Sequence, residues 1–156
     1  MGTGKSTVAR ALAQKINKDL IDTDNMIESR IGKSIAEIFT RKGEECFRRI
    51  ERQIFKEIVS ENNLVIATGG GTLLDRENYR LALKNGIVIL LQASPSVIFK
   101  RLQKESSRPL LSAENKFERI IDLINQRKAK YSCFRHCIDT SNLTVNQVVE
   151  KTIQIY

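Results

Sequence analysis

The sequence lacks the features that mark membrane, fibrous and low-complexity proteins. No apolar run approaches the roughly 20 residues of a membrane-spanning helix, and no charged and then apolar segment of a secretory signal opens the chain. Two prolines and eight glycines exclude a collagen-like or low-complexity chain. Hydrophobic residues make up 41% and charged residues 28% of 156 residues, a composition and length that suit one globular domain.

Cysteine is also scarce. The three cysteines, Cys46, Cys133 and Cys137, form no Cys-x-x-Cys pair, which indicates free thiols and a cytoplasmic protein. His136 lies between two of them in the sequence, but a structural zinc site needs four ligands. Chance proximity therefore explains this group better than a zinc site does.

Tryptophan is absent and aromatic residues make up only 6%, whereas Lys and Arg outnumber Asp and Glu by 26 to 18. The net charge of +8 favours an anionic partner, which on charge alone includes nucleic acid, an acidic membrane surface or a phosphorylated small molecule. A nucleic-acid-binding module gathers basic and aromatic residues on one face, but the basic residues here are scattered beside glutamates, as in Lys56-Glu57. We therefore predict small-molecule partners, and neither nucleic acid nor a membrane.

Short apolar runs alternate with longer amphipathic stretches, which predicts an α/β protein. No repeat, linker or change in composition interrupts residues 1–156, so we expect a single domain. Capping-box patterns at Ser34 and Thr144 predict two helix starts. The expected strands are 20–22, 64–67, 87–91 and 136–139, and the expected helices begin at Lys5, Ser34, Glu44, Pro95, Phe117 and Thr144.

The first residues match the end of a phosphate-binding loop. Gly4-Lys5-Ser6 fits the end of the pattern G-x-x-x-x-G-K-[ST], whose first glycine falls two positions before Met1. Gly2 and Gly4 allow close approach of a phosphate, toward which the following helix points its N–H groups. Lys5 would reach the β- and γ-phosphates of a nucleotide, and Ser6 would ligate Mg²⁺. The amphipathic helix that follows favours this interpretation over a flexible terminus.

The strand that precedes the loop in such folds is absent from the sequence. Loss of a strand leaves unpaired backbone on its neighbours. We therefore expect the natural product to begin upstream, with Met1 an internal methionine. In-frame upstream DNA should encode a short apolar run and then a glycine, and a stop codon there would contradict this expectation.

Asp22 and Asp24 form an Asp-x-Asp pair at the end of a predicted strand. Alternation along a strand puts both carboxylates on one side, and the carboxyl ends of parallel strands face the ligand crevice. One carboxylate would hold a Mg²⁺-bound water, and the other would orient or deprotonate an acceptor hydroxyl. A helix cap at Asp24 explains the pair equally well.

Two further motifs involve arginine and glycine. Arg48 and Glu51 share one face of a predicted helix, where Glu51 would hold the guanidinium, although a surface ion pair explains them better when they are taken alone. Gly69-Gly70-Gly71 directly follows an apolar strand and suits close approach of the backbone to a ligand.

The polar segment 104–115 reads as a loop that contains Arg108. An arginine on such a loop would close over a transferring phosphate as part of a lid. Arg127 lies on a predicted helix and carries no information by itself.

Together these motifs closely resemble the shikimate kinase family, P-loop kinases of aromatic amino-acid biosynthesis. The ordered set covers nearly the whole sequence and is far more specific than any single motif. Its members are Gly-x-Gly-Lys-Ser-Thr, Asp22-Thr23-Asp24, Ile27-Glu28 with Gly32-Lys33-Ser34-Ile35, Gly43-Glu44 to Phe47-Arg48-x-x-Glu51, Gly69-Gly70-Gly71, Arg108-Pro109-Leu110-Leu111 and Arg127-x-x-x-Tyr131.

The resemblance implies a three-layer α/β/α fold with a parallel sheet in the order 2-3-1-4-5, from which this chain lacks the first strand. Residues 25–60 would form the shikimate-binding helical region, and residues 104–115 the lid. The chain would be a monomer that transfers the γ-phosphate of ATP to the 3-hydroxyl of shikimate with Mg²⁺ as cofactor. Two alternatives stay open: another P-loop metabolite kinase such as gluconate kinase, or an inactive truncated kinase that only binds substrate.

The resemblance also implies roles for the matched residues. Lys5, Asp24 and Arg108 would be catalytic, with Asp24 as the base, and Mg²⁺ would be held by Ser6 and, through water, by Asp22. The ATP-binding residues would be Gly2, Thr3, Gly4, Lys5, Ser6, Thr7, Arg101 and Arg108, with Arg101 against adenine. The shikimate-binding residues would be Asp24, Arg48, Gly69, Gly70, Gly71 and Arg127, with the two arginines on the carboxylate and the glycine N–H groups lining the pocket.

Overall fold

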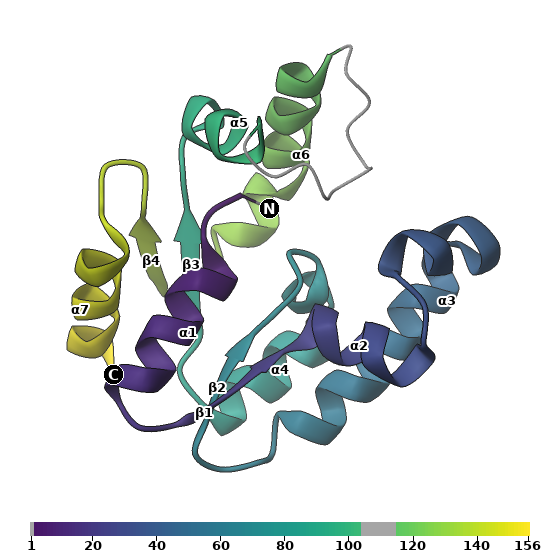
Figure 1. Ribbon diagram of the computed structural model, residues 1–156, viewed down its shortest axis with the longest axis horizontal. Helices are drawn as coiled ribbons and strands as arrows, with labels where there is room; N and C mark the ends of the chain where they lie inside the picture. Colours follow the sequence, from purple (N-terminus) through teal and green to yellow (C-terminus); the bar gives the residue numbers. More distant parts are fainter. Residues whose placement is uncertain (1, 104–114) are drawn as a thin grey trace. The chain divides into compact units, whose positions relative to one another are not determined.

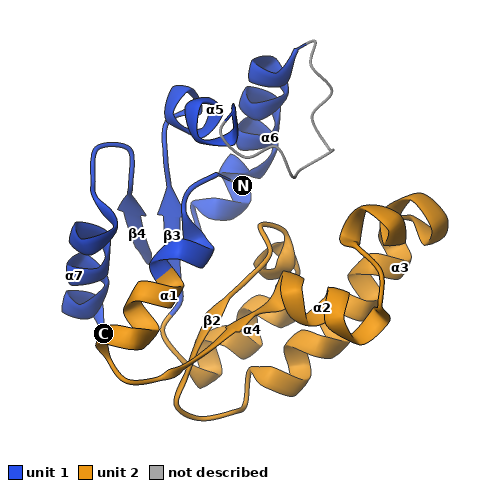
Figure 2. Ribbon diagram, in the orientation of Figure 1, with its two compact units in different colours: residues 1–8, 88–156 blue, residues 9–87 orange. Residues whose placement is uncertain are grey.

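The computed structural model describes residues 2–103 and 115–156, and all its paired strands are parallel, which confirms the predicted α/β class. The chain divides into two compact units (Figure 2). The first, which we call the loop unit, comprises the residues through Val8 and Val88–Tyr156; the second, the triplet unit, comprises Ala9–Ile87 and contains the three consecutive glycines. Helix α1 (Lys5–Lys15) begins in the loop unit and ends in the triplet unit.

The triplet unit contains one pair of strands. β1 (Asp19–Asp22) pairs with β2 (Leu64–Ala67), with Asp22 opposite Ala67 at the carboxyl end of both strands. The sequence predicts both: β2 is an apolar run, and β1 is a short strand that ends in the carboxylate of Asp22. Because the strands are parallel, the segments that follow Asp22 and Ala67 leave from the same edge. This pairing brings the Asp-x-Asp motif and the glycine triplet together.

Two helices build the core of the triplet unit. α2 (Thr23–Ile31) packs against α3 (Ile35–Ile58), as Figure 1 shows. Apolar side chains at helical spacing form their contact: Ile27, Ile38, Phe47 and Ile54 are all buried. The Ser34 capping box is present, and Gly43 breaks α3 with φ 77° and ψ 172°. The predicted short helix that ends near Gly43 and the longer helix after it are therefore confirmed as the two arms of α3.

In the loop unit, β3 (Ile89–Gln92) pairs with β4 (His136–Asp139), with Gln92 opposite Asp139. α5 (Pro95–Gln103) and α6 (Lys116–Tyr131) lie side by side in Figure 1. Buried Ile98, Leu102 and Ile120 form their contact. α7 (Val145–Ile155) begins at Thr144, whose capping box is present as predicted, and contacts β4.

The observed pairs are those that the order 2-3-1-4-5 requires. Expected strands two and three are β1 and β2, and expected strands four and five are β3 and β4. Residues 2–103 and 115–156 form two two-stranded sheets, with no strand joining one pair to the other.

Some elements differ from the expectation. The predicted strand 87–91 is observed as Ile89–Gln92, and the sequence reasoning missed the short 3₁₀ helix η1 (Thr72–Leu74) and α4 (Arg76–Asn85). Both follow the glycine triplet, where Asp75 caps α4 by accepting hydrogen bonds from the Glu77 and Asn78 N–H groups. Nearly all of the predicted lid lies outside the described residues. In the part of the chain that the structure describes, no helix is long and apolar enough to cross a membrane.

Candidate active site

The phosphate loop has the backbone that its sequence predicts. Gly2 and Gly4 have φ values of 69° and 88°, in the left-handed region that glycine favours. A Cβ atom at Gly2 would also lie 2.9 Å from Ile98 Cγ2. The loop leads into α1, whose first N–H groups carry partial positive charge and suit a phosphate. Lys5 is half-buried, whereas Ser6 and Thr7 are exposed on the first turn of α1.

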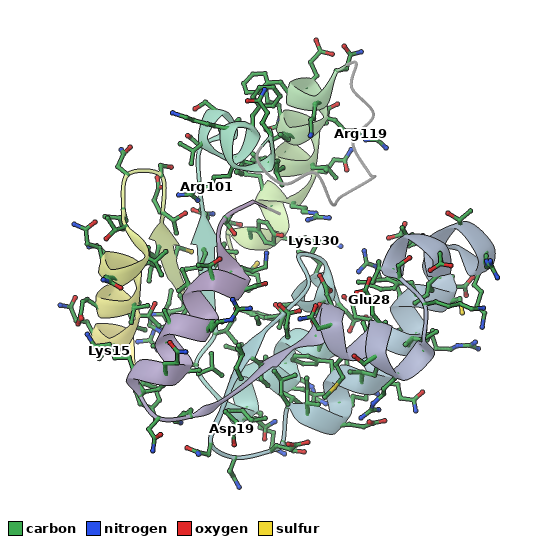
Figure 3. The ribbon with its side chains drawn as sticks, in the orientation of Figure 1. Lys15, Asp19, Glu28, Arg101, Arg119 and Lys130 are labelled. Atoms are coloured by element: carbon green, nitrogen blue, oxygen red, sulfur yellow. The ribbon has the colours of Figure 1, made fainter. Side chains whose placement is uncertain are left out.

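Arg101 and Thr140 fasten this loop. Arg101 Nη1 donates to the Gly2 carbonyl at 3.4 Å and to Thr140 Oγ1 at 3.0 Å, and Nη2 donates to the Thr140 carbonyl at 2.8 Å. Thr140 is 2% exposed, and its hydroxyl lies 3.1 Å from the Thr3 carbonyl and 3.0 Å from the Gln92 carbonyl. Figure 3 labels Arg101 at the end of α5. In this structure the arginine predicted to lie against adenine holds the loop backbone.

Asp22 and Asp24 lie on different elements. Asp22 ends β1 and caps α2, with Oδ1 accepting from the Asp24 N–H at 3.0 Å and the Asn25 N–H at 3.4 Å. Asp24 belongs to the first turn of α2, so strand alternation is the wrong reason for placing the two carboxylates together. The proposed helix cap at Asp24 is wrong as well, since the cap is Asp22.

Arg48 is held by two glutamates of very different exposure. Nη1 donates to Glu51 Oε2 at 2.7 Å, and Glu51 is 3% exposed. Nε and Nη2 donate to Glu44 Oε1 at 3.2 and 3.1 Å, and the Glu44 side chain is 66% exposed. Burial alone lowers the pKa of Arg48, but hydrogen bonds and charge from Glu51 and Glu44 outweigh burial and raise it. A surface ion pair is thus the wrong description of Arg48 and Glu51.

The glycine triplet makes room for these side chains. A Cβ at Gly69 would lie 2.7 Å from Asp24 Oδ1, and a Cβ at Gly71 would lie 2.6 Å from Arg48 Nη1. The Gly69 N–H donates to the buried hydroxyl of Thr23 at 3.0 Å. The triplet therefore brings backbone directly against the Asp24 carboxylate and the Arg48 guanidinium. A residue with a side chain at Gly69 or Gly71 would clash with these two groups.

Two predicted site residues stay untested. Arg127 is half-buried on α6 of the loop unit, whereas Arg48 belongs to the triplet unit. Their joint grip on one carboxylate stays a prediction. Arg108 lies outside the described residues.

Comparison with known proteins identifies the family. The family model for shikimate kinase matches residues 1–156. The chain belongs to the shikimate kinase family. A shikimate kinase from Thermodesulfovibrio yellowstonii is 44% identical over 156 residues, which are 100% of this chain and 90% of the relative. A shikimate kinase from Thermus thermophilus is 41% identical over 155 residues, which are 99% of this chain and 84% of the relative.

Solved structures agree with the family. The structure of shikimate kinase from Acinetobacter baumannii in complex with shikimate has a TM-score of 0.91 and 33% identity, over 99% of this chain and 87% of that chain. A gluconokinase from Sinorhizobium meliloti has a TM-score of 0.61 and 14% identity, over 99% of this chain and 85% of that chain. The second likeness shows a shared fold alone.

The sequence did not predict the roles of three threonines that hold the motif residues of this shikimate kinase family member in place. Thr23 bonds the glycine triplet, Thr72 bonds Glu51 at 2.7 Å and Thr140 bonds the phosphate loop. Each threonine directly follows a motif residue or a strand end. Their position was a usable signal, because a short hydroxyl side chain readily bonds nearby backbone and caps.

The predicted magnesium ligands suit that ion. Ser6 offers a hydroxyl oxygen on the exposed first turn of α1, and Asp22 offers a carboxylate. Hard oxygen donors, few from protein and the rest from water and phosphate, are what Mg²⁺ prefers. Asp22 Oδ1 accepts two helix-capping bonds, and its contact with the ion through water stays a prediction.

Proposed function

We propose that this chain transfers the γ-phosphate of ATP to the 3-hydroxyl of shikimate, giving shikimate 3-phosphate and ADP. The observation that carries the proposal is the Arg48 guanidinium, which the buried Glu51 orients at 2.7 Å and Gly71 borders, in a chain of this family. A planar guanidinium that is fixed in this way is built to receive a carboxylate. Shikimate supplies one.

The loop unit binds ATP in this proposal. Gly2, Thr3 and Gly4 approach the phosphates with backbone, and Lys5 places its ammonium group on the β- and γ-phosphates. Ser6 and Thr7 contribute hydroxyls from the first turn of α1. Ser6 and, through water, Asp22 would hold Mg²⁺, which neutralises charge on the phosphates when it is bound. Arg101 lies against adenine, and Arg108 reaches the transferred phosphate.

The triplet unit binds and activates the acceptor. The carboxylate of shikimate takes the place of the exposed Glu44 on Nε and Nη2 of Arg48, while buried Glu51 keeps Nη1. Arg127 contributes a second guanidinium. Gly69, Gly70 and Gly71 border the bound ring.

Asp24 accepts the proton of the 3-hydroxyl as that oxygen attacks the γ-phosphorus. The bond from the γ-phosphorus to the β,γ-bridging oxygen then breaks, and ADP leaves with that oxygen. Little covalent chemistry is required of the protein, so positioning and charge stabilisation supply the catalysis. We further propose that the enzyme works as a cytoplasmic monomer.

The deciding experiment offers the purified chain ATP and Mg²⁺ with shikimate or gluconate, and detects the phosphorylated product by mass spectrometry. We expect shikimate 3-phosphate and ADP in equal amounts, and no product from gluconate. Preferential phosphorylation of gluconate would favour the alternative metabolite kinase. Binding of shikimate without any product would favour a chain that binds but does not turn over.

A further inference from the structure

Thr72 occupies a buried position behind Arg48. It directly follows the glycine triplet and is 0% exposed. Its Oγ1 donates to Glu51 Oε1 at 2.7 Å, while Glu51 Oε2 accepts from Arg48 Nη1 at 2.7 Å. Each oxygen of this buried carboxylate therefore has its own donor. The Thr72 hydroxyl, the Glu51 carboxylate and the Arg48 guanidinium thus form a continuous hydrogen-bonded series. Its last member, Arg48, would contact the proposed substrate.

The backbone and α4 fix Thr72 in turn. Its N–H donates to the Gly69 carbonyl at 3.2 Å, and its own carbonyl accepts from Asn78 Nδ2 at 3.0 Å. Asn78 is 0% exposed, and its N–H is held by Asp75 at 3.1 Å. These bonds hold the backbone of Thr72 in place. Because the hydroxyl is attached to a fixed backbone, its bond to Glu51 sets the plane of the Glu51 carboxylate.

A carboxylate bonded through one oxygen alone can turn about its own axis. A second donor on the other oxygen removes that freedom and stabilises the buried charge. The guanidinium that pairs with Glu51 then keeps one orientation. Thr72 Oγ1, Glu51 Oε1 and Asp24 Oδ1 lie 3.0, 3.1 and 2.7 Å from the position of a Cβ at Gly69, so the glycine lets these three side chains pack against one stretch of backbone.

We propose that Thr72 is a positioning residue for the acid substrate, acting through Glu51 on Arg48. The proposal rests on the proposed function, because it assigns Arg48 to the carboxylate of shikimate. Thr72 touches neither substrate nor reacting atoms in this scheme. It determines how strongly the site prefers an acid over a neutral analogue.

The test compares Thr72→Val, which removes the hydroxyl at nearly constant volume, with Thr72→Ser, which keeps it. Thr152→Val is the matched control: Thr152 is 5% exposed, and its hydroxyl donates to the Val148 carbonyl within α7. KM and kcat are measured for ATP, for shikimate and for shikimate methyl ester. The ester lacks the negative charge that Arg48 receives.

For Thr72→Val we expect KM for shikimate to rise about 10-fold, with kcat and KM for ATP within about 2-fold of wild type. The preference for the acid over the ester should shrink by a similar factor. Thr72→Ser should restore both values, and Thr152→Val should change neither. An equal rise for acid and ester, a loss confined to kcat, or a serine variant as impaired as the valine variant would overturn the proposal.

A second measurement needs no turnover. NMR of the guanidinium NH groups reports how fast the Arg48 side chain rotates in the substrate-free protein. We expect faster rotation in Thr72→Val than in wild type or Thr72→Ser. Unchanged rotation overturns the role of Thr72 even if the chain phosphorylates shikimate. Faster rotation in a chain that never phosphorylates shikimate overturns the proposed function and leaves the Thr72–Glu51–Arg48 linkage standing.

Discussion

Two arginines, one in each unit, do opposite things with the same guanidinium group. Arg101 in the loop unit donates to neutral oxygens of Gly2 and Thr140. Arg48 in the triplet unit donates to the carboxylates of Glu51 and Glu44. The first arginine fixes backbone, and the second presents a charge whose exposed partner a substrate can replace.

The difference between the partners of Arg101 and Arg48 indicates how each unit would bind its proposed ligand. In the proposed function, the loop unit orders backbone N–H groups with Arg101 and Thr140, and Lys5 and Arg108 bring positive charge to the phosphates. The triplet unit holds its half-buried arginine on a buried carboxylate, since Glu51 is 3% exposed. Damage to the loop unit should therefore appear in ATP use, and damage to the triplet unit in the affinity for the acid.

Of the substitutions that test this difference between the units, Lys5→Ala should have the largest effect on activity. Removal of a charged group that stabilises the transferring phosphate should lower kcat about 10³-fold, with little effect on the fold because Lys5 lies at the first position of α1. Steady-state kinetics and the thermal midpoint check both parts. Lys15→Ala, in the last turn of the same helix, is the control and should keep full activity. A Lys5→Ala variant with more than a tenth of wild-type kcat would remove Lys5 from the phosphate site.

Gly71→Ala should damage the triplet unit selectively. The new Cβ would lie 2.6 Å from Arg48 Nη1 and must displace the guanidinium, so we expect KM for shikimate to rise about 10-fold while KM for ATP stays unchanged. Substrate titrations at saturating co-substrate measure both. The control is Gly86→Ala, where a Cβ meets nothing within 4 Å. Equal effects of the two substitutions would mean that the closeness to Arg48 is irrelevant.

Thr140→Val should damage the loop unit by a smaller amount. It removes a buried hydroxyl that bridges Arg101 to the Thr3 and Gln92 carbonyls. We expect KM for ATP to rise about 5-fold and KM for shikimate to stay unchanged. Thr152→Val, another buried hydroxyl of the same unit, should leave both values unchanged. A rise in KM for shikimate alone would contradict the division between the units.

The smallest expected effect concerns acid stability of the loop unit. Hydrogen bonds from the Ser141 hydroxyl and N–H, at 2.6 and 2.8 Å, lower the pKa of Asp139. A carboxyl whose pKa is lower in the folded state adds stability above the ordinary Asp pKa and loses it as the pH falls through about 4 and below. Urea midpoints at pH 7 and pH 3 should therefore differ slightly less in Asp139→Asn than in wild type. An unchanged difference would show that these bonds do not contribute.

Much of the fold could be predicted because its signals are local. All four strands overlap runs that the sequence predicts, and capping boxes at Ser34 and Thr144 begin the helices where the sequence predicts. The non-helical Gly43 separates two predicted helices. The bounds of β3 differ from the predicted 87–91, because periodicity does not fix where an apolar run joins its partner.

The network around each motif depends on tertiary structure, and sequence reasoning found less of it. Arg48 and Glu51 share a helix face and could be paired from spacing alone, but the second partner of Glu51, Thr72, belongs to η1, which the sequence reasoning missed. The sequence predicts Asp22 on a strand and Asp24 either on the same strand or as a helix cap, whereas Asp22 is both the end of the strand and the cap, and the helix begins at Thr23. The bonds of Arg101 join positions 99 and 39 residues apart, separations that no local pattern encodes.

The most direct test of the account is the effect of Arg48→Ala on the two Michaelis constants. We expect KM for shikimate to rise about 100-fold, because the charge-assisted bonds to the carboxylate are lost, while KM for ATP changes less than about 2-fold. Arg49→Ala, the exposed neighbour on α3, controls for the loss of a positive charge. An unchanged KM for shikimate in Arg48→Ala would contradict the carboxylate-receiving role on which the proposed function rests.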